Sequence, residues 1–253
     1  MSGAAHQAVN DAIEVRKCES LEEFHACVTL QREIWREAEL EVEPATTFVV
    51  AANTGGQVLG AYAGNSLVGY TLAFAGLRNG AAYLHSHMTG VRANYRDRGV
   101  GRMLKLFQRE EALRRDIRLI EWTFDPLEMR NAHFNLNRLG AISRRYVPNL
   151  YGITTSPLHR GLATDRLVAE WFLDSPHVMA ALNNELPAPP FSSKIEIPAS
   201  LDDWEASDSA LFQSVQAAIR EEFTEYFAKG YAAIAVSKTS AGSAYQLVPW
   251  SDF

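Results

Sequence analysis

The sequence predicts an α/β fold, in the α+β sense of one mixed sheet with helices packed against it. Strand patterns at 58–63, 67–74 and 81–91 are separated by Gly64-Asn65-Ser66 and Asn79-Gly80, residues that accept the positive φ of hairpin turns. Helical and strand patterns then alternate along the chain. At 253 residues and 47% apolar content, the chain can build one sizeable core with room for an elaboration.

The elements before the hairpins begin with a short strand. Residues 1–12 are small and polar, which predicts a flexible tail, and residues 13–16 alternate like a strand. Ser20 and Glu23 form a capping box, so we expect a helix from there to about Glu37. Residues 47–53 are compatible with either a helix or a strand.

The elements after the hairpins begin with a helix over 100–115 and a strand over 119–124. Asp125 as N-cap, Pro126 at N1 and Glu128 in a capping box predict that the next helix starts at once. Gly140 ends that helix, and a strand over 141–146 follows.

The remainder of the chain changes in composition after residue 174. Residues 165–173 alternate like a strand, and Pro187, Pro189 and Pro190 then mark a linker. The later elements are a strand at 195–198, a helix at 208–228 and hairpin strands at 231–236 and 245–248. We therefore divide the chain into a tail over 1–12, a core domain over 13–173 and an extension over 174–253 that packs on the core.

Charge and cysteine content exclude several classes of protein. A net charge of −6 argues against a general nucleic-acid binder. Cys18 and Cys27 are too few for a disulfide framework or a zinc site, so we expect reduced packing residues and no metal. The first residues lack the pattern of a signal peptide, and no run reaches the ~18 apolar residues of a membrane span. We therefore expect a cytoplasmic protein with no membrane partner.

One stretch, residues 83–107, carries the functional signal. Arg96 to Gly101 reads RDRGVG and stands where a strand passes into a helix. Glycines permit a tight turn, and the helix start adds unpaired N–H donors, which together favour a phosphate pocket. The dinucleotide pattern G-x-G-x-x-G is excluded because Leu104 stands at its third glycine, and no G-K-[ST] is present.

The segment 91–101, VRANYRDRGVG, resembles the signature of the GNAT superfamily of coenzyme-A-dependent N-acyltransferases, whose form includes R/Q-x-x-G-x-G/A. The resemblance covers roughly residues 13–146. It implies that an acyl-coenzyme A is the cosubstrate, with the pantetheine arm along the strand at 88–91 and the pyrophosphate on backbone N–H groups of residues 98–102. The implied cofactor-binding residues of this stretch are Met88, Thr89, Gly90, Val91, Arg96, Asp97, Arg98, Gly99, Val100, Gly101 and Arg102.

The sequence departs from the family pattern at two positions. Ala93 replaces a proline of the loop, and Leu136 stands where many relatives have the tyrosine that protonates the departing thiolate. Either another acid acts here, with Tyr146 and Tyr151 nearest in sequence, or none is needed because a thiolate is a tolerable leaving group.

Other candidates come from the flanking elements. Asn131, Asn135 and Arg138 fall at i, i+4 and i+7 and would share a helix face toward the cofactor, although a solvated face is the other interpretation. For the base that acylation of an amine requires, we consider His85 and His87, which project to one strand face, and Glu121 on the neighbouring strand. Such histidines could instead be hydrogen-bonded core residues.

Arg160 and Arg166 could bind a substrate carboxylate by the bidentate geometry of arginine, or form ordinary ion pairs. The segment 123–141, TFDPLEMRNAHFNLNRLGA, also resembles a GNAT branch with a long C-terminal extension, some of whose members look like succinyl-coenzyme-A-dependent amino-acid N-acyltransferases.

The predicted function is therefore direct transfer of an acetyl or other short acyl group, with succinyl as one candidate, to the amine of a small molecule such as an amino acid. A homodimer is compatible with this prediction. The alternatives are a non-catalytic acyl-coenzyme-A sensor or scaffold, and a protein-lysine acetyltransferase.

Overall fold

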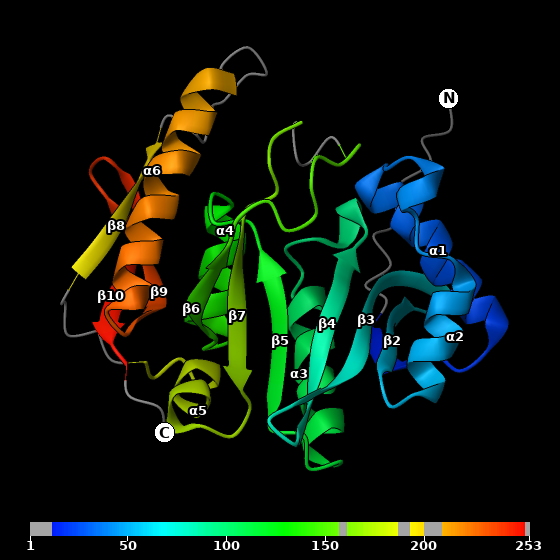
Figure 1. The fold of residues 1–253 in the computed structure, drawn as a ribbon. Helices are drawn as coiled ribbons and strands as arrows, with labels where there is room; N and C mark the ends of the chain where they lie inside the picture. Colours follow the sequence, from blue (N-terminus) through cyan, green and yellow to red (C-terminus); the bar gives the residue numbers. More distant parts are fainter. Residues whose placement is uncertain (1–11, 157–160, 187–192, 200–208, 251–253) are drawn as a thin grey trace, which may run out of the picture.

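The structure is a computed structural model that describes residues 12–156, 161–186, 193–199 and 209–250. These residues form one ten-stranded sheet with the order β1-β2-β3-β4-β5-β7-β6-β9-β10-β8 (Figure 1). Neighbouring strands are antiparallel except β4 and β5, which are parallel. The prediction of a mixed α/β sheet is confirmed.

The strands are β1 Ile13–Lys17, β2 Gln57–Ala63, β3 Ser66–Arg78, β4 Ala81–Val91, β5 Leu119–Phe124, β6 Ile142–Val147, β7 Arg166–Phe172, β8 Ser193–Pro198, β9 Tyr231–Thr239 and β10 Gly242–Pro249. The α-helices are α1 Leu21–Trp35, α2 Ala45–Asn53, α3 Val100–Leu113, α4 Met129–His133, α5 Pro176–Leu182 and α6 Ser209–Ala228. Two 3-10 turns, η1 Glu39–Glu41 and η2 Ala93–Tyr95, and a π-helix, η3 Phe134–Arg138, complete the order.

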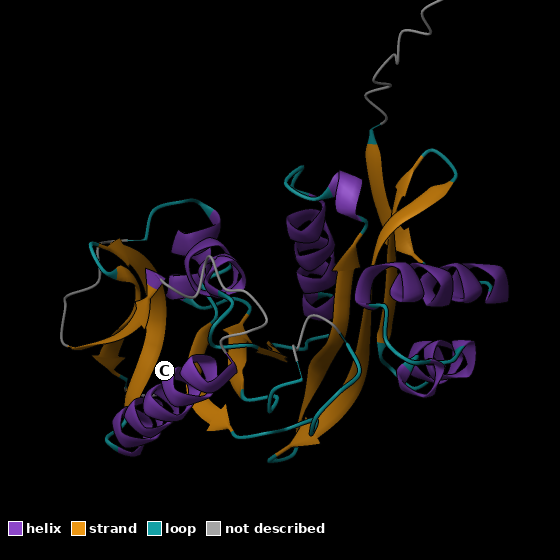
Figure 2. Cartoon of the chain, turned by 90° about the horizontal axis from the view of Figure 1, so that it is seen from above, coloured by secondary structure: helices purple, strands orange, loops and turns teal. Residues whose placement is uncertain are grey.

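The helices lie on both faces of the sheet. Helices α1, α2 and α6 cover one face, whereas α3, α4 and α5 lie on the other (Figures 1 and 2). None of the described helices is both long enough and apolar enough to cross a membrane. On the face that carries α1, α2 and α6, strands β4 and β5 lie between the α1–α2 pair and α6 (Figure 1).

Local signals explain the elements that carry the site. The Ser20 hydroxyl accepts from the N–H of Glu23, and the Glu23 carboxylate accepts from the N–H of Ser20, so the predicted capping box is present. Residues Asn79 and Gly80 adopt φ of 50° and 80°, which is the positive-φ pair that a tight hairpin between β3 and β4 requires.

The helix expected at Asp125 begins later than predicted. Asp125 accepts from the N–H of Leu127 at 2.9 Å and closes a local turn, so the residue does not cap a helix. Helix α4 starts at Met129 and passes into the π-helix at Phe134. Gly140 ends this helical segment with a φ of 71°, as predicted.

The residues after 174 extend the same sheet. Strand β9 pairs with β6 through Ser143 and Ala233, and the hydroxyl of Tyr245 donates to the carbonyl of Pro126 at 2.7 Å. Buried side chains of β8, α6, β9 and β10 share one hydrophobic cluster with those of β5 and β7. The short helix α5 was not predicted, although Ser175 caps it and Pro176 stands in its first turn. The predicted linker prolines lie outside the described residues.

Candidate active site

The sheet opens between β4 and β5. These strands pair only at Leu84 with Ile120 and at His85 with Glu121. One residue later, β4 carries a bulge against β3: Ser86 pairs with Ala73 and Met88 with Leu72, which leaves His87 as the extra residue. A bulge bends its strand and increases the local twist. The two parallel strands therefore part directly after His85 and Glu121.

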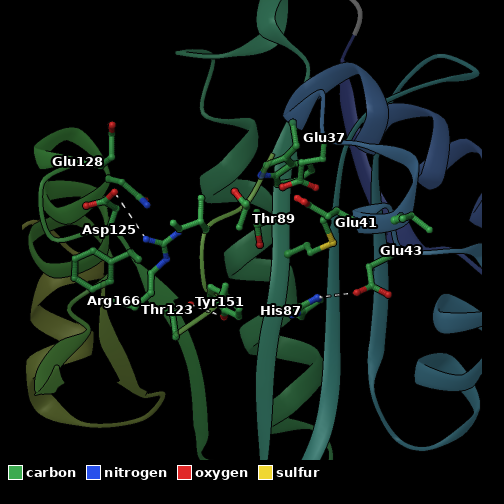
Figure 3. A pocket seen from close by; sticks show the side chains of 17 residues that line it. Glu37, Glu41, Glu43, His87, Thr89, Thr123, Asp125, Glu128, Tyr151 and Arg166 are labelled. Atoms are coloured by element: carbon green, nitrogen blue, oxygen red, sulfur yellow. Dashed lines mark hydrogen bonds and ion pairs between the residues drawn. The ribbon is translucent and has the colours of Figure 1, made fainter. Parts of the chain in front are cut away.

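A cavity of about 720 Å³ lies at this opening. Its walls come from the connector between α1 and α2, the bulged end of β4, the end of β5 and the loop before β7 (Figure 3). Among the described residues that line it, Arg166 and His87 are basic and five carry carboxylates: Glu37, Glu41, Glu43, Asp125 and Glu128.

His87 faces the cavity with a carboxylate beside it. Its Nε2 lies 3.4 Å from Oε1 of Glu43, and the two side chains point toward one another in Figure 3. The ring centroid of His85 is 6.3 Å from that of His87, so both rings lie on one strand face, but His85 is not among the residues that line the cavity. Burial and the neighbouring His87 lower the pKa of His85, which favours its neutral form.

Glu121 belongs to an ion network below the cavity. It is only 2% exposed, and Arg78 and Arg145 both donate to its carboxylate. Because two guanidinium groups already occupy this carboxylate, Glu121 is a poor candidate for accepting a substrate proton.

The two candidate tyrosines lie in different surroundings. The hydroxyl of Tyr146 donates to Asp165 at 2.6 Å, its ring stacks on Phe223, and burial raises its pKa. Tyr151 lines the cavity, and its hydroxyl lies 2.9 Å from that of Thr123. Leu136, at the position of the usual family tyrosine, is fully buried in the core.

The glycine-arginine loop is open on its outer side. Gly99 is the N-cap of α3 with a φ of 80°, and a Cβ built on it would meet nothing within 4 Å. A Cβ on Gly101 would meet only Val91 Cγ2, at 4.0 Å. The N–H of Met103 bonds to Gly99, so the preceding N–H groups of the first turn have no helical acceptor. A helix start with unpaired N–H groups of this kind can accept an anion.

The side chains of this loop hold it in place. Nε of Arg96 donates to the carbonyl of Val91 at 3.2 Å, and the guanidinium of Arg98 lies 5.1 Å from the ring centroid of Tyr95. Asp97, with a φ of 64°, forms an ion pair with Arg130 on α4. Arg102 extends away from the loop, because its Nη2 donates to the carbonyl of Leu182 at 3.0 Å.

The end of β4 lies along the cavity. Met88 and Thr89 line it, and the hydroxyl of Thr89 lies 3.1 Å from that of Thr71 on β3. Packing explains why residue 90 is a glycine, because a Cβ there would lie 2.6 Å from the ring of Trp35. Val91, the last residue of the strand, is partly buried against the cluster that includes Val100.

The three polar residues expected on one helix face are separated. Asn131 lines the cavity, whereas Asn135 is 2% exposed, has its Nδ2 buried without a partner, and is not a lining residue; Arg138 is exposed. The expected spacing assumed an α-helix throughout. The change to a π-helix at Phe134 adds residues to each turn and rotates the later positions away.

Arg166 is the described member of the predicted arginine pair, since Arg160 lies outside the described residues. Its side chain is 6% exposed and lines the cavity. Its Nη1 donates to the carbonyl of Asp165 at 2.8 Å and lies 3.8 Å from Asp125 Oδ2.

The glutamates of the connector were missed by the sequence analysis. Burial and the nearby charges of Glu41 and Glu43 raise the pKa of Glu37. Glu41 also accepts from the N–H of Thr155 at 3.1 Å, which ties the connector to the loop before β7. The available signal was the alternation of glutamate at 37, 39, 41 and 43 in a segment without a clear structural pattern. Within the described part of the chain, no three His, Cys, Asp or Glu side chains are grouped to hold a metal ion.

No protein-family model and no curated protein matches the sequence. Solved structures do match. The ribosomal-protein-S18-alanine N-acetyltransferase from Escherichia coli is 12% identical with a TM-score of 0.52, covering 65% of this chain and 96% of that one. NAA60 from Arabidopsis thaliana in complex with acetyl-CoA is 14% identical with a TM-score of 0.52, covering 64% and 99%. A GNAT-family acetyltransferase structure from Desulfovibrio desulfuricans is 13% identical with a TM-score of 0.52, covering 64% and 99%. The chain therefore has the fold of the GNAT N-acetyltransferases.

Proposed function

We propose that this protein is an acyl-coenzyme-A-dependent N-acyltransferase that acylates the amine of a small molecule. The main support for the proposal is the His87–Glu43 pair, which faces the cavity where β4 and β5 part. From this point β4 continues toward the open loop at the start of α3, so one strand connects a base with an anion pocket.

The residues present fit coenzyme A along this path. The backbone of residues 88–91 would lie beside the pantetheine arm, and the N–H groups of residues 98–102 would hold the pyrophosphate, with Arg96 and Arg98 supplying positive charge. Asn131, which lines the cavity, would donate to the pantetheine amides. When bound, the acyl-coenzyme A supplies the acyl group as a reactive thioester.

His87 would remove the proton from the attacking amine, which must be neutral to act as a nucleophile. A proton on Nε2 directed toward Glu43 leaves Nδ1 free to accept, and the Glu43 carboxylate then stabilises the imidazolium that forms. Backbone N–H groups of β4 beyond His85 have no β5 partner and could polarise the thioester carbonyl. We place no covalent intermediate on the protein, because Cys18 and Cys27 are buried and neither lines the cavity.

Tyr151 is our candidate for protonating the departing thiolate. Its hydroxyl lies at the cavity wall beside Thr123, whereas Tyr146 is committed to Asp165. His85 and Glu121 would act through the surroundings of His87 rather than on the substrate.

The charge of the cavity favours an acceptor that carries positive charge. Among the described residues, five carboxylates line the cavity, and the one arginine that lines it already lies near Asp125. Opposite charges attract a substrate and raise its encounter rate, and like charges repel it. We therefore favour diamines and basic amino acids over acidic acceptors, and acetyl or another uncharged short acyl group over succinyl, for which Arg166 would be the binding residue.

Thiol release from acetyl-coenzyme A over a panel of amines tests the proposal. The panel contains diamines, neutral amino acids, acidic amino acids and lysine-containing peptides, and mass spectrometry identifies the product. We expect turnover with cationic small amines and loss of turnover in His87→Gln. Coenzyme A binding without thiol release from any amine would instead favour the sensor, and acylation of the peptides alone would favour a protein-lysine acetyltransferase.

A further inference from the structure

Lys105 on α3 is an ionisable side chain that is buried with no carboxylate partner among the described residues. The residue is 3% exposed. Its Nζ donates to Ser86 Oγ at 2.8 Å and to Gln108 Oε1 at 3.1 Å, and it lies 4.0 Å from the ring centroid of Trp122. Burying a lysine amino group is costly unless its N–H groups are hydrogen-bonded, so a buried lysine at this position calls for a functional or structural explanation.

The partners of Lys105 lie on the two strands that part. Ser86 on β4 and Trp122 on β5 are the residues that directly follow the last pair of these strands, His85 with Glu121. The amino group of Lys105 therefore lies across the opening, with a hydrogen bond to one strand and a contact with the tryptophan ring of the other.

Lys105 reaches this point from the face opposite the cavity. Alternation along β4 directs Ser86 toward α3, while His85 and His87 project to the other face. Helix α3 lies behind β4 and β5 in Figure 1.

We propose that Lys105 is a positioning residue that holds β4 and β5 apart where they diverge, so that the slot for the pantetheine arm and thioester is open before the ligand binds. Parallel strands gain hydrogen bonds when they pair, and the bulge at His87 alone leaves their ends free to move toward one another. An amino group fixed to Ser86, Gln108 and the Trp122 ring resists that movement. A preformed slot binds its ligand more tightly, because less ordering accompanies binding.

This inference rests on the proposed function, and two measurements separate them. The first is calorimetric binding of coenzyme A to the wild type, which both require. The second compares the coenzyme A affinity of the wild type with that of Lys105→Met, which keeps an unbranched side chain of similar length but removes the amino group. The matched control is Lys238→Met, the same change at an exposed position of β9.

We expect Lys105→Met to bind coenzyme A at least tenfold more weakly. Its KM for acetyl-coenzyme A should rise by the same factor, while its KM for the amine changes less than twofold. Lys238→Met should match the wild type. Ser86→Ala, which leaves the lysine in place, should weaken binding about threefold, and its effect should disappear in the Lys105→Met background because both variants remove one contact.

Equal coenzyme A affinity in wild type and a folded Lys105→Met would overturn the inference while leaving the proposed function intact. If Lys105→Met does not fold, unchanged affinity in Ser86→Ala would overturn it. A wild type that does not bind coenzyme A would overturn both, and equal losses in both KM values would reduce Lys105 to a general structural residue and likewise overturn the positioning role.

Discussion

Replacing Lys105 by methionine should change how the free energy of unfolding depends on pH. Burial lowers the pKa of Lys105 from its ordinary 10.5 to about 7. Between these two values the unfolded chain carries a proton on this lysine and the native protein does not, so the stability of the wild type rises with pH. Each pKa unit corresponds to about 1.4 kcal/mol, so the full difference is about 5 kcal/mol, and the part between pH 7 and 9 is about 3 kcal/mol.

Urea unfolding followed by tryptophan fluorescence, at pH 6, 7, 8 and 9, measures this effect. Other groups that titrate in this range affect both proteins, so the informative quantity is wild type minus Lys105→Met. We expect that difference to be constant below about pH 7 and to rise by about 3 kcal/mol by pH 9. Parallel curves would refute the reasoning. They would mean that Ser86, Gln108 and the Trp122 ring keep the lysine protonated in the folded protein.

Three further variants test separate parts of the structure. Arg98→Glu reverses a charge at the open loop and should weaken coenzyme A binding at least tenfold by calorimetry; unchanged affinity with an intact fold would contradict the anion site. His87→Ala should lower kcat by about two to four orders of magnitude while coenzyme A affinity stays the same, because only the proton acceptor is removed; an unchanged rate would exclude His87 as the base. Ser20→Ala removes the cap of α1 and should lower the free energy of unfolding by about 1 kcal/mol in urea titrations; a neutral result would show that packing alone sets the start of the helix.

Several parts of the fold and site can be predicted from the sequence because they depend on a few neighbouring residues. A capping box needs only Ser20 and Glu23 three residues apart, and a tight hairpin needs only the positive φ that Asn79 and Gly80 accept. The open loop at Gly99 belongs to the same group, because a glycine before a helix start leaves N–H groups exposed whatever packs elsewhere.

Other parts depend on competition between alternatives that the local sequence does not resolve. Asp125, Pro126 and Glu128 are a valid helix start, yet Asp125 closes a turn instead, and the Pro126 carbonyl accepts from Tyr245 on the distant strand β10. The π-helix that separates Asn131 from Asn135 is likewise held from outside, since Asn137 pairs with both backbone groups of Val236 on β9.

Residues within a few positions of one another were enough to predict the class of fold, the start of α1, the β3–β4 hairpin and the glycine loop before α3. Three contacts became visible only in the folded chain: His87 meets Glu43, five carboxylates among the described residues gather on one cavity, and Lys105 lies across the opening between β4 and β5. These contacts join residues far apart in the chain. Their partners are set by strand order, by one bulge and by the helix packed behind it, and none of these is encoded in a local pattern.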